Sequence, residues 1–285
     1  MQKETLTVNY RDYRGSHQVL VSGTHQSSYE FKIADKHLAL ATLNWSPYIS
    51  QSICKHGWIF QSVVALLHRI GYGATITYYP WSRAVSMTES GKADLLFPEY
   101  FIEPEAPSDV FLGTQRKDHI TLSESIGWGP IAFISRKDYN TEHYKGQLSN
   151  LNNERIGVVR GYQNTPEFDR LMDQGSFQIV AAKDDLTNVE LLINNRVNLI
   201  IGDPEVIKSE IKNSDKSAAE KKQMLGAIKV IDPIIKMNAL FLAISKRSQH
   251  YESLVIELNK AIIEFKNHGV FSEIKYLTQS KCTND

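Results

Sequence analysis

An arginine and several aromatic residues carry side-chain chemistry by which a protein could hold a small polar molecule. The guanidinium of Arg116 offers a planar pair of donors that matches a carboxylate, and this pairing is stronger in a desolvated cleft than in water. Arg116 could equally be a solvated arginine, in which case Arg83 could take its place. The aromatic faces of Trp45, Tyr48 and Trp81 could stack on a ligand or hold its cation, or they could belong to the hydrophobic core.

Polar residues also come before two predicted helices. Thr165 is followed by Pro166, a pattern typical of a helix N-cap with proline at the first helical position. Together with Gln163 and Asn164 it could donate to an anion, although capping alone would explain it. Asp203 ends an apolar strand pattern before a proline, where accepting a backbone N–H would also suffice. Both positions therefore have a structural as well as a ligand-binding interpretation.

The sequence carries few signs of catalysis. It lacks the Gly-x-Ser-x-Gly, His-Glu-x-x-His and Gly-x-x-x-x-Gly-Lys patterns of nucleophilic, zinc-dependent and phosphate-binding sites. The 9 histidines are scattered without metal-ligand spacing, so we expect no metal and no cofactor. Glu99 and Glu103 are the only residues that we would consider as a general acid or base. We therefore do not expect an enzyme.

Composition and charge narrow the possible partners. Of the 285 residues 42% are hydrophobic, and 32 basic side chains balance 32 acidic ones, so no net field favours nucleic acid. The longest apolar runs fall short of the roughly 20 residues of a membrane-spanning helix. Met1–Lys36 has no apolar stretch typical of a signal peptide, so the leader of an exported protein would be missing here. Cys54 and Cys282 are either unrelated thiols or, in an oxidising compartment, a disulfide.

Short strand patterns alternate with helical patterns from residue 38 onward, which is typical of β-α-β units. The first are a strand over Leu38–Leu43, a helix over Trp58–Ile70, a strand over Ala74–Tyr79, a helix over Trp81–Ser90 and a strand over Asp94–Phe97. The carboxyl ends of such strands and the N-termini of the helices converge on one edge of a sheet. The candidate residues that follow predicted strands are Trp45, Trp81, Tyr100, Tyr162 and Asp203.

The chain is expected to form two α/β lobes. We predict that residues 1–136 and 237–285 form lobe one, and that residues 137–236 form lobe two, with a crossing in the polar stretch Arg136–Asn153. Residues 1–36 form an N-terminal extension with possible strands at Leu6–Tyr10 and Gln18–Val21. The proline-rich and acidic segment Pro98–Val110 is predicted to be a long, functional loop.

Several segments in order carry a resemblance to a known family. They are Tyr79–Ala84 with Gly91–Pro98, Arg116 with Ser123, Ile156–Gly161 with Asp203, and Leu242–Lys246 with Phe265–Ile274. Their order and spacing resemble the family 3 extracellular solute-binding proteins, receptors that deliver amino acids and related solutes to membrane transporters. The resemblance covers about residues 37 to 277.

This resemblance implies a type II periplasmic binding fold, with two lobes, each a mostly parallel sheet flanked by helices, and a ligand cleft between them. It implies a monomeric periplasmic receptor that captures a small polar ligand, an amino acid or related compound, by hinge closure and presents it to the permease of an ABC transporter. A ligand-sensing module of a signalling receptor uses the same fold, and so do a few lyases. In the family, the arginine matched by Arg116 grips the ligand's carboxylate, and the aspartate matched by Asp203 meets its amino group.

The ligand-binding residues expected on this basis are Trp45, Tyr48, Trp81, Arg83, Phe97, Tyr100, Arg116, Tyr162, Gln163, Asn164, Thr165 and Asp203. The sequence departs from the family around two of them. Leu112–Gln115 replaces the family's "T-x-T-P-E" before the arginine, and Gly161–Thr165 replaces a "G-T-T" segment. The identity of the solute is therefore open, as is the choice between transport and sensing.

Overall fold

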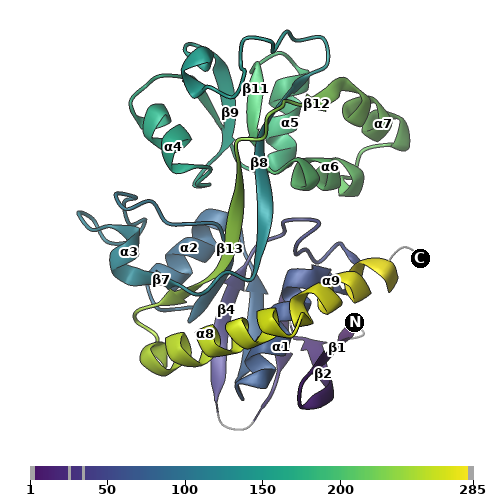
Figure 1. Ribbon diagram of the computed structural model, residues 1–285, viewed down its shortest axis with the longest axis vertical. Helices are drawn as coiled ribbons and strands as arrows, with labels where there is room; N and C mark the ends of the chain where they lie inside the picture. The colour runs from purple at the N-terminus through teal and green to yellow at the C-terminus, as the bar shows by residue number, and fades with distance from the viewer. Residues whose placement is uncertain (1–3, 25–26, 34–35, 282–285) are drawn as a thin grey trace. The chain divides into compact units, whose positions relative to one another are not determined.

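The computed structural model describes residues 4–24, 27–33 and 36–281 (Figure 1). The chain divides into two compact units: unit 1 comprises Met1–Gly127 and Ala239–Asp285, and unit 2 comprises Trp128–Asn238. The first division falls inside a single long strand, earlier in the sequence than the boundary expected after residue 136. The polar stretch Arg136–Asn153 consequently falls entirely within unit 2. None of the helices in the described part of the chain has the length and apolar character of a membrane span.

Unit 1 is built on one mixed sheet with the strand order β1-β2-β3-β5-β4-β6-β13, and β7 also pairs with β13. Strands β5, β4 and β6 are parallel, whereas the other pairings in this sheet are antiparallel. The strands are β1 (Thr5–Asp12), β2 (Gly15–Gly23), β3 (Ser28–Phe31), β4 (His37–Thr42), β5 (Gly73–Tyr78), β6 (Leu95–Glu99), β7 (Ile120–Leu122) and β13 (Lys236–Ser245).

The helices of unit 1 follow the predicted β-α-β pattern. They are the 3-10 helix η1 (Cys54–His56), α1 (Gly57–Arg69), α2 (Trp81–Glu89), α3 (Arg116–His119), α8 (Tyr251–Asn267) and α9 (Val270–Lys281). Residues 57–67 of α1 are buried on every side, because this helix joins the parallel strands β4 and β5 and also packs against α8 and α9. The helix expected over Trp58–Ile70 is thus confirmed to within one residue at each end.

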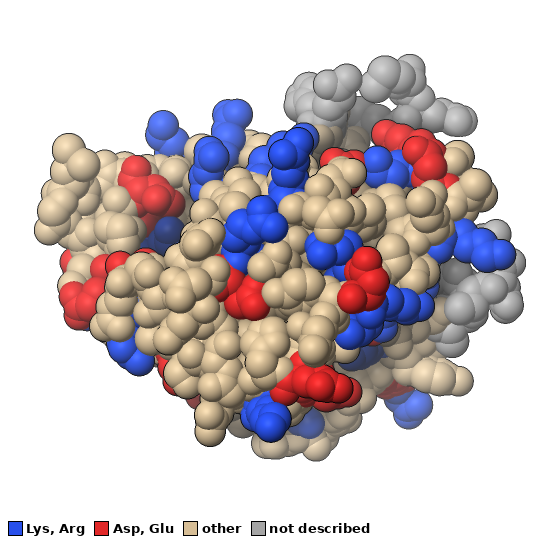
Figure 2. Space-filling model, turned by 90° about the horizontal axis from the view of Figure 1, so that it is seen from above, with Lys and Arg blue, Asp and Glu red and all other residues tan. Residues whose placement is uncertain are grey.

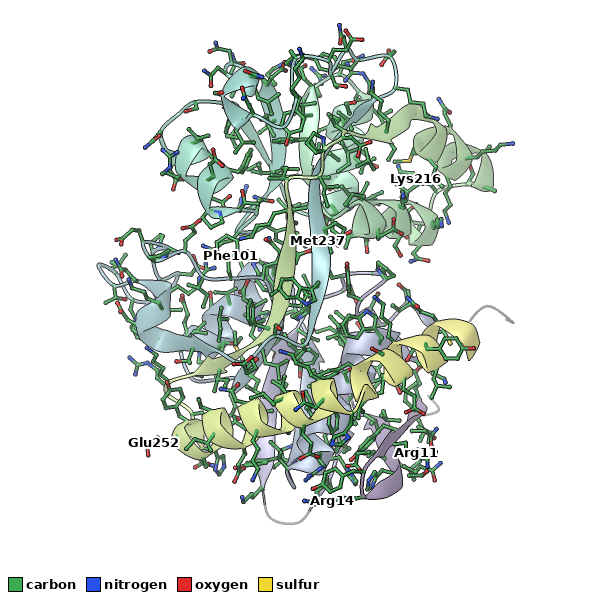
Figure 3. All side chains as sticks on the ribbon, viewed as in Figure 1. Arg11, Arg14, Phe101, Lys216, Met237 and Glu252 are labelled. Atoms are coloured by element: carbon green, nitrogen blue, oxygen red, sulfur yellow. The ribbon has the colours of Figure 1, made fainter. Side chains whose placement is uncertain are left out.

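The N-terminal extension forms a hairpin that lengthens the sheet of unit 1. Strands β1 and β2 pair along their whole length, and β1 contacts α1 and α9 (Figure 1). The hairpin turn carries Arg14 (Figure 3), whose backbone N–H donates to the buried carboxylate of Asp12 over 2.8 Å. The other oxygen of Asp12 lies 3.2 Å from the guanidinium of Arg69 on α1, which also pairs with Glu264 on α8 at 2.7 Å. Both strands expected in the extension are confirmed, and an ion-pair network ties the hairpin to two helices.

Unit 2 has a smaller sheet with the order β8-β11-β9-β10, and β12 pairs with β8. Strands β11, β9 and β10 are parallel, and β8 is antiparallel to β11. The elements are β8 (Gly127–Arg136), η2 (Leu148–Leu151), β9 (Arg155–Val159), α4 (Pro166–Asp173), β10 (Gln178–Ala182), α5 (Asp185–Ile193), β11 (Leu199–Gly202), α6 (Pro204–Asn213), α7 (Ala218–Ala227) and β12 (Ile228–Val230). Apolar residues of α5, α6 and α7 pack with β8 and β11 into one buried cluster, which is the core of this unit.

Candidate functional site

The carboxyl ends of three parallel strands bring aromatic residues together in unit 1. Two hydrogen bonds hold this edge: the Thr42 hydroxyl donates to the Phe97 carbonyl over 2.6 Å, and the Tyr79 N–H donates to the Thr42 carbonyl over 2.7 Å. Beyond it, Trp45 stacks on Tyr48 with ring centroids 4.6 Å apart. We call Trp45, Tyr48 and Tyr100 the aromatic group, because Tyr100 meets the Trp45 ring edge-on at 5.4 Å.

The local chain explains why these rings meet. Trp45 and Ile49 exchange backbone hydrogen bonds of 2.6 and 3.0 Å, which close a tight turn directly after β4 and set Tyr48 beside Trp45. Trp45 and Tyr48 are at least nine-tenths buried, whereas Tyr100 is half-buried and open to solvent on part of its surface. Phe97 is fully buried within β6. Tyr100 is therefore the member of the group with accessible surface for a ligand.

Trp81 and Arg83 lie at the start of α2, which follows β5. Trp81 is the first residue of the helix and is half-buried. Arg83 is exposed, and its guanidinium lies 5.1 Å from the centre of the Tyr79 ring. Of the two arginines considered for a carboxylate, Arg83 is the one whose charge faces solvent.

Arg116 is not solvated, so the alternative interpretation weighed for it does not apply. It begins the short helix α3, and only 6% of its surface is exposed. Its guanidinium pairs with Glu89 at 3.5 Å and with Asp109 at 3.1 Å. Glu89 is itself completely buried in α2, and its carboxylate also accepts from the Ser108 hydroxyl and the Asp109 N–H. Arg116 thus fastens the loop that follows β6 to α2. Pro98 and Glu99, which were expected in this loop, belong to β6. The role of Arg116 with a ligand stays a prediction.

Glu99, the last residue of β6, holds a buried carboxyl group beside the aromatic group. One oxygen accepts from the Tyr100 N–H over 3.1 Å, and the other has no hydrogen-bond partner among the described residues. Burial raises the pKa of Glu99 to about 7, although the charge of Arg116 and the Tyr100 hydrogen bond act to lower it. The carboxyl group can therefore hold or release a proton near neutral pH.

A second set of polar groups lies at the carboxyl edge of the sheet in unit 2. Tyr162 follows β9, Asp185 follows β10 and Asp203 follows β11. The Tyr162 hydroxyl donates to Asp185 over 3.2 Å. Burial raises the pKa of Asp185 to about 7, and the negative charges of Glu210, Asp184 and Asp203 add to this, although the Tyr162 hydrogen bond acts to lower it. Acidic residues that come after β10 and β11 therefore lie together at this edge.

Sequence reasoning missed Asp185. Its signal was the same one that selected Asp203: an acidic residue placed between a strand and the helix that follows it. Asp184 in front of it looks like an ordinary N-cap, and its carboxylate does accept from the Thr187 N–H over 2.8 Å. The neighbouring carboxylate is the one that turns inward, and 5% of its residue surface is exposed.

The polar residues before α4 and α6 have the structural roles weighed for them. Thr165 caps α4, because its hydroxyl accepts from the Phe168 N–H over 3.2 Å. The backbone carbonyl of Asn164 accepts from the Asn238 amide over 2.5 Å. Asp203 caps α6, accepting from the Glu205 N–H over 2.8 Å. Asn164, Thr165 and Asp203 are all buried, and Gln163 is half-buried. Whether any of them also contacts a ligand stays a prediction.

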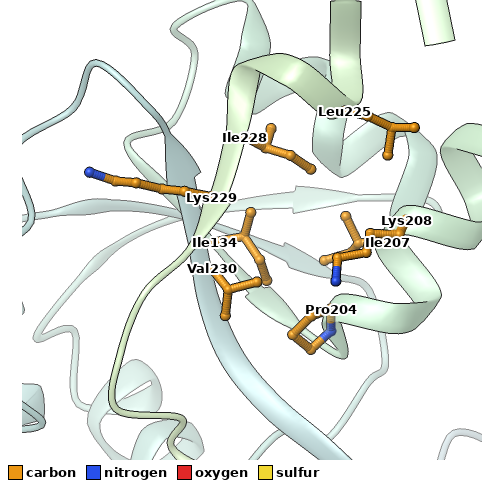
Figure 4. Close-up of a pocket in the computed structure, with 8 residues that line it drawn as sticks. All are labelled: Ile134, Pro204, Ile207, Lys208, Leu225, Ile228, Lys229 and Val230. Carbon is orange, nitrogen blue, oxygen red and sulfur yellow. The ribbon is translucent and has the colours of Figure 1, made fainter. Parts of the chain in front are cut away.

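A separate pocket in unit 2 does not suit a polar solute. It has a volume of about 260 Å³ and lies among α6, α7, β8 and β12 (Figure 4). Its lining is mostly aliphatic, and Figure 4 shows the Lys229 ammonium directed away from the other side chains. The lining residues are Ile134, Pro204, Ile207, Lys208, Leu225, Ile228, Lys229 and Val230, none of which is a predicted site residue.

The distribution of surface charge and the arrangement of potential metal ligands identify no further candidate site among the described residues. Basic and acidic side chains are interspersed on the face shown in Figure 2, in keeping with their equal numbers in the sequence. Within residues 4–24, 27–33 and 36–281, no group of three His, Cys, Asp or Glu side chains is arranged to hold a metal ion. Cys54 at the start of η1 is not a free thiol. Cys282 lies outside the described residues, so its state stays a prediction.

Solved structures define the class of fold. No protein-family model and no curated protein matches this sequence. The chain is similar to the structure of an arginine 3rd transport system periplasmic binding protein from Legionella pneumophila, with 17% identity and a TM-score of 0.61 over 84% of this chain and 98% of that one. It is similar to a histidine kinase sensor domain with similarity to periplasmic binding proteins, with 14% identity and a TM-score of 0.64 over 87% and 97%.

A third similar structure is an ancestral amino acid-binding protein described as a precursor of cyclohexadienyl dehydratase, with 16% identity and a TM-score of 0.61 over 84% of this chain and 93% of that one. Together these likenesses show that the chain has the two-lobed periplasmic-binding-protein fold, and the predicted fold class is confirmed. The sheet of unit 1 is mixed rather than mostly parallel, because the N-terminal hairpin and β3 add antiparallel strands to it.

Proposed function

We propose that this chain is an extracytoplasmic receptor that binds a small polar solute, an amino acid or a related compound, and presents it to a membrane transporter. The observation that carries the proposal is the placement of polar and aromatic side chains at the carboxyl edge of parallel strands in each unit. These edges are where open α/β sheets bind ligands. The structures similar to this chain are mostly of binding proteins, and they include a transport-system protein and a sensor domain.

The proposed mechanism is hinge closure around the solute. A ligand that contacts residues of both units stabilises the arrangement in which both sets of contacts form, and a transporter reads that arrangement. We place the ligand contacts at Trp81, Arg83, Tyr100 and Tyr162, the predicted aromatic and basic site residues with accessible surface. We also propose a monomer in the periplasm, the state in which the transporter would meet it.

A thermal-shift screen tests binding directly. The full chain is heated with amino acids, polyamines, sugars and carboxylates, because a ligand that binds the folded state at 100 times its Kd stabilises that state by about 2.7 kcal/mol. A hit is then repeated with Arg83→Ala, and with Lys229→Ala as a matched control, since Lys229 lines the apolar pocket, donates to the Tyr139 carbonyl and is not among the proposed ligand contacts. A carboxylate hit that is lost in Arg83→Ala and kept in Lys229→Ala supports the site. No stabilisation by any of these classes would count against a solute receptor.

A sensing module for a signalling receptor is the second candidate, and the likeness to a histidine kinase sensor domain favours it. The two candidates differ in the partner that reads the bound state. Uptake of the identified ligand by cells with and without this chain separates them, because a transport receptor is needed for uptake and a sensor is not. A lyase is the third candidate and would use Glu99 or Glu103; incubation of the ligand with the chain should then release a product.

A further inference from the structure

Among the buried ionisable groups of unit 1, Glu99 stands out by its position. It ends β6, the strand that lies parallel to β4, and the next residue, Tyr100, reaches the ring of Trp45. Its exposed fraction is 4%, so water reaches it poorly. A buried carboxyl group normally finds donors for both oxygens, because an unsatisfied oxygen has lost its contacts with water and gained nothing in exchange.

Only one of the two carboxyl oxygens of Glu99 accepts a hydrogen bond from the described residues. The Tyr100 N–H donates to one oxygen, and no described residue donates to the other. Arg116 is the cation whose charge reaches Glu99, but its ion pairs within 4.0 Å are with Glu89 and Asp109. Asp12 elsewhere in unit 1 is also buried, and its Oδ2 likewise accepts no hydrogen bond, but a guanidinium nitrogen of Arg69 lies 3.2 Å from that oxygen. The second oxygen of Glu99, which is buried, therefore has no donor among the described residues, and a bound molecule could supply one.

We propose that Glu99 is a ligand-binding residue, and that the solute taken by this receptor carries an ammonium or amidinium group that donates to its carboxylate beside the aromatic group. This inference rests on the receptor function proposed above. A cationic donor forms a charge-assisted hydrogen bond, which is shorter and stronger than a neutral one. The ring of Tyr100, which has accessible surface, adds attraction for the same cation. An amine with a short apolar stem matches both features.

The test uses the full chain and a defined set of probes. Butane-1,4-diamine and agmatine carry cationic ends, butane-1,4-diol is a neutral analogue of the diamine, and succinate is an anionic one. We expect at least one of the two cations to raise the melting temperature, and the diol and succinate to have no effect. Calorimetric titration then measures the Kd of the stabilising cation for three proteins: the unaltered chain, Glu99→Gln and the matched control Glu105→Gln. Glu105 lies in the adjoining loop, is exposed, and accepts from the Gln115 amide.

Glu99→Gln should weaken binding of the cation at least tenfold, and Glu105→Gln less than twofold. Glu99→Gln should still fold, because a neutral amide in this buried position avoids the cost of a charge; a melting temperature at or above that of the unaltered chain checks this. Equal affinity of both variants for the cation would overturn the inference, as would binding of succinate in place of the amines. If sugars or carboxylates stabilise the chain and amines do not, the receptor function stands and this inference fails.

Discussion

The pH dependence of stability tests whether burial at the sheet edge of unit 2 disfavours a negative charge on Asp185. Burial raises its pKa from 3.8 to about 7, so the folded chain binds a proton there more tightly than the unfolded chain does. Stability should therefore fall as the pH rises from about 4 through 7, and stay low above that range. The difference between the two pKa values corresponds to at most roughly 4 kcal/mol. Asp185→Asn removes the charge, and its amide oxygen can still accept from Tyr162.

We therefore expect Asp185→Asn to be more stable than the unaltered chain at pH 8, by up to a few kcal/mol, and similar to it at pH 4. Urea unfolding followed by circular dichroism at pH values between 4 and 8.5 measures this. Asp184→Asn is the matched control: it makes the same change one residue earlier, at an exposed N-cap where asparagine caps as well as aspartate. The control should show no comparable gain at pH 8.

A constant difference between Asp185→Asn and the unaltered chain across this pH range would refute the reasoning. It would mean that Asp185 is ionised in the folded chain as readily as in the unfolded one. A loss of stability at pH 8 would refute it more strongly, because the carboxylate would then be held by favourable contacts. In either case the pKa of Asp185 would not be raised by its burial.

Two further substitutions test the packing. Arg69→Met should lower the free energy of unfolding by about 3–5 kcal/mol, because it removes the cation shared by buried Asp12 and by Glu264; a urea midpoint close to that of the unaltered chain would contradict this. Gly157→Ala should lower the free energy of unfolding by about 1–3 kcal/mol, since its new methyl group would clash with the Asn188 side chain. Gly226→Ala, in open space on α7, should raise the free energy of unfolding by up to about 1 kcal/mol. Equal melting temperatures for the two alanine variants would argue against the clash.

The fold was accessible from the sequence because its signals are local. Apolar spacing predicted α1 and α2 to within a residue or two, and the two possible strands noted in the N-terminal extension are both present. Pairing direction is not local. The register of β3 against β5 depends on contacts between segments more than 40 residues apart, as the pair Ser28 and Thr77 shows. The mixed sheet of unit 1 therefore could not be predicted from spacing alone.

The candidate site could be predicted from the sequence only in part, because much of it also depends on contacts between distant residues. Capping by Thr165 and Asp203 depends on the next few residues, and the sequence contains them. The environment of Arg116 depends on Glu89, which lies 27 residues earlier and is buried by its own helix. Spacing from a family motif selected the arginine, but it gave no information about the acids that surround it. The same limit hid Asp185, whose neighbours come from three separate strand ends.

Three buried acids in the described part of the chain, Asp12, Glu99 and Asp185, are of two kinds, and the difference bears on function. Although burial acts to raise the pKa of Asp12, hydrogen bonds from His17 and the Arg14 N–H and the charge of Arg69 lower it, so this carboxylate is stabilised in its charged form and helps to hold the hairpin. Glu99 and Asp185 have pKa values raised to about 7, because burial outweighs the contacts that favour their charge. Perturbed groups of this second kind gather at functional sites. Each lies at the carboxyl edge of the parallel strands in its own unit, which is the edge at which open α/β sheets bind ligands.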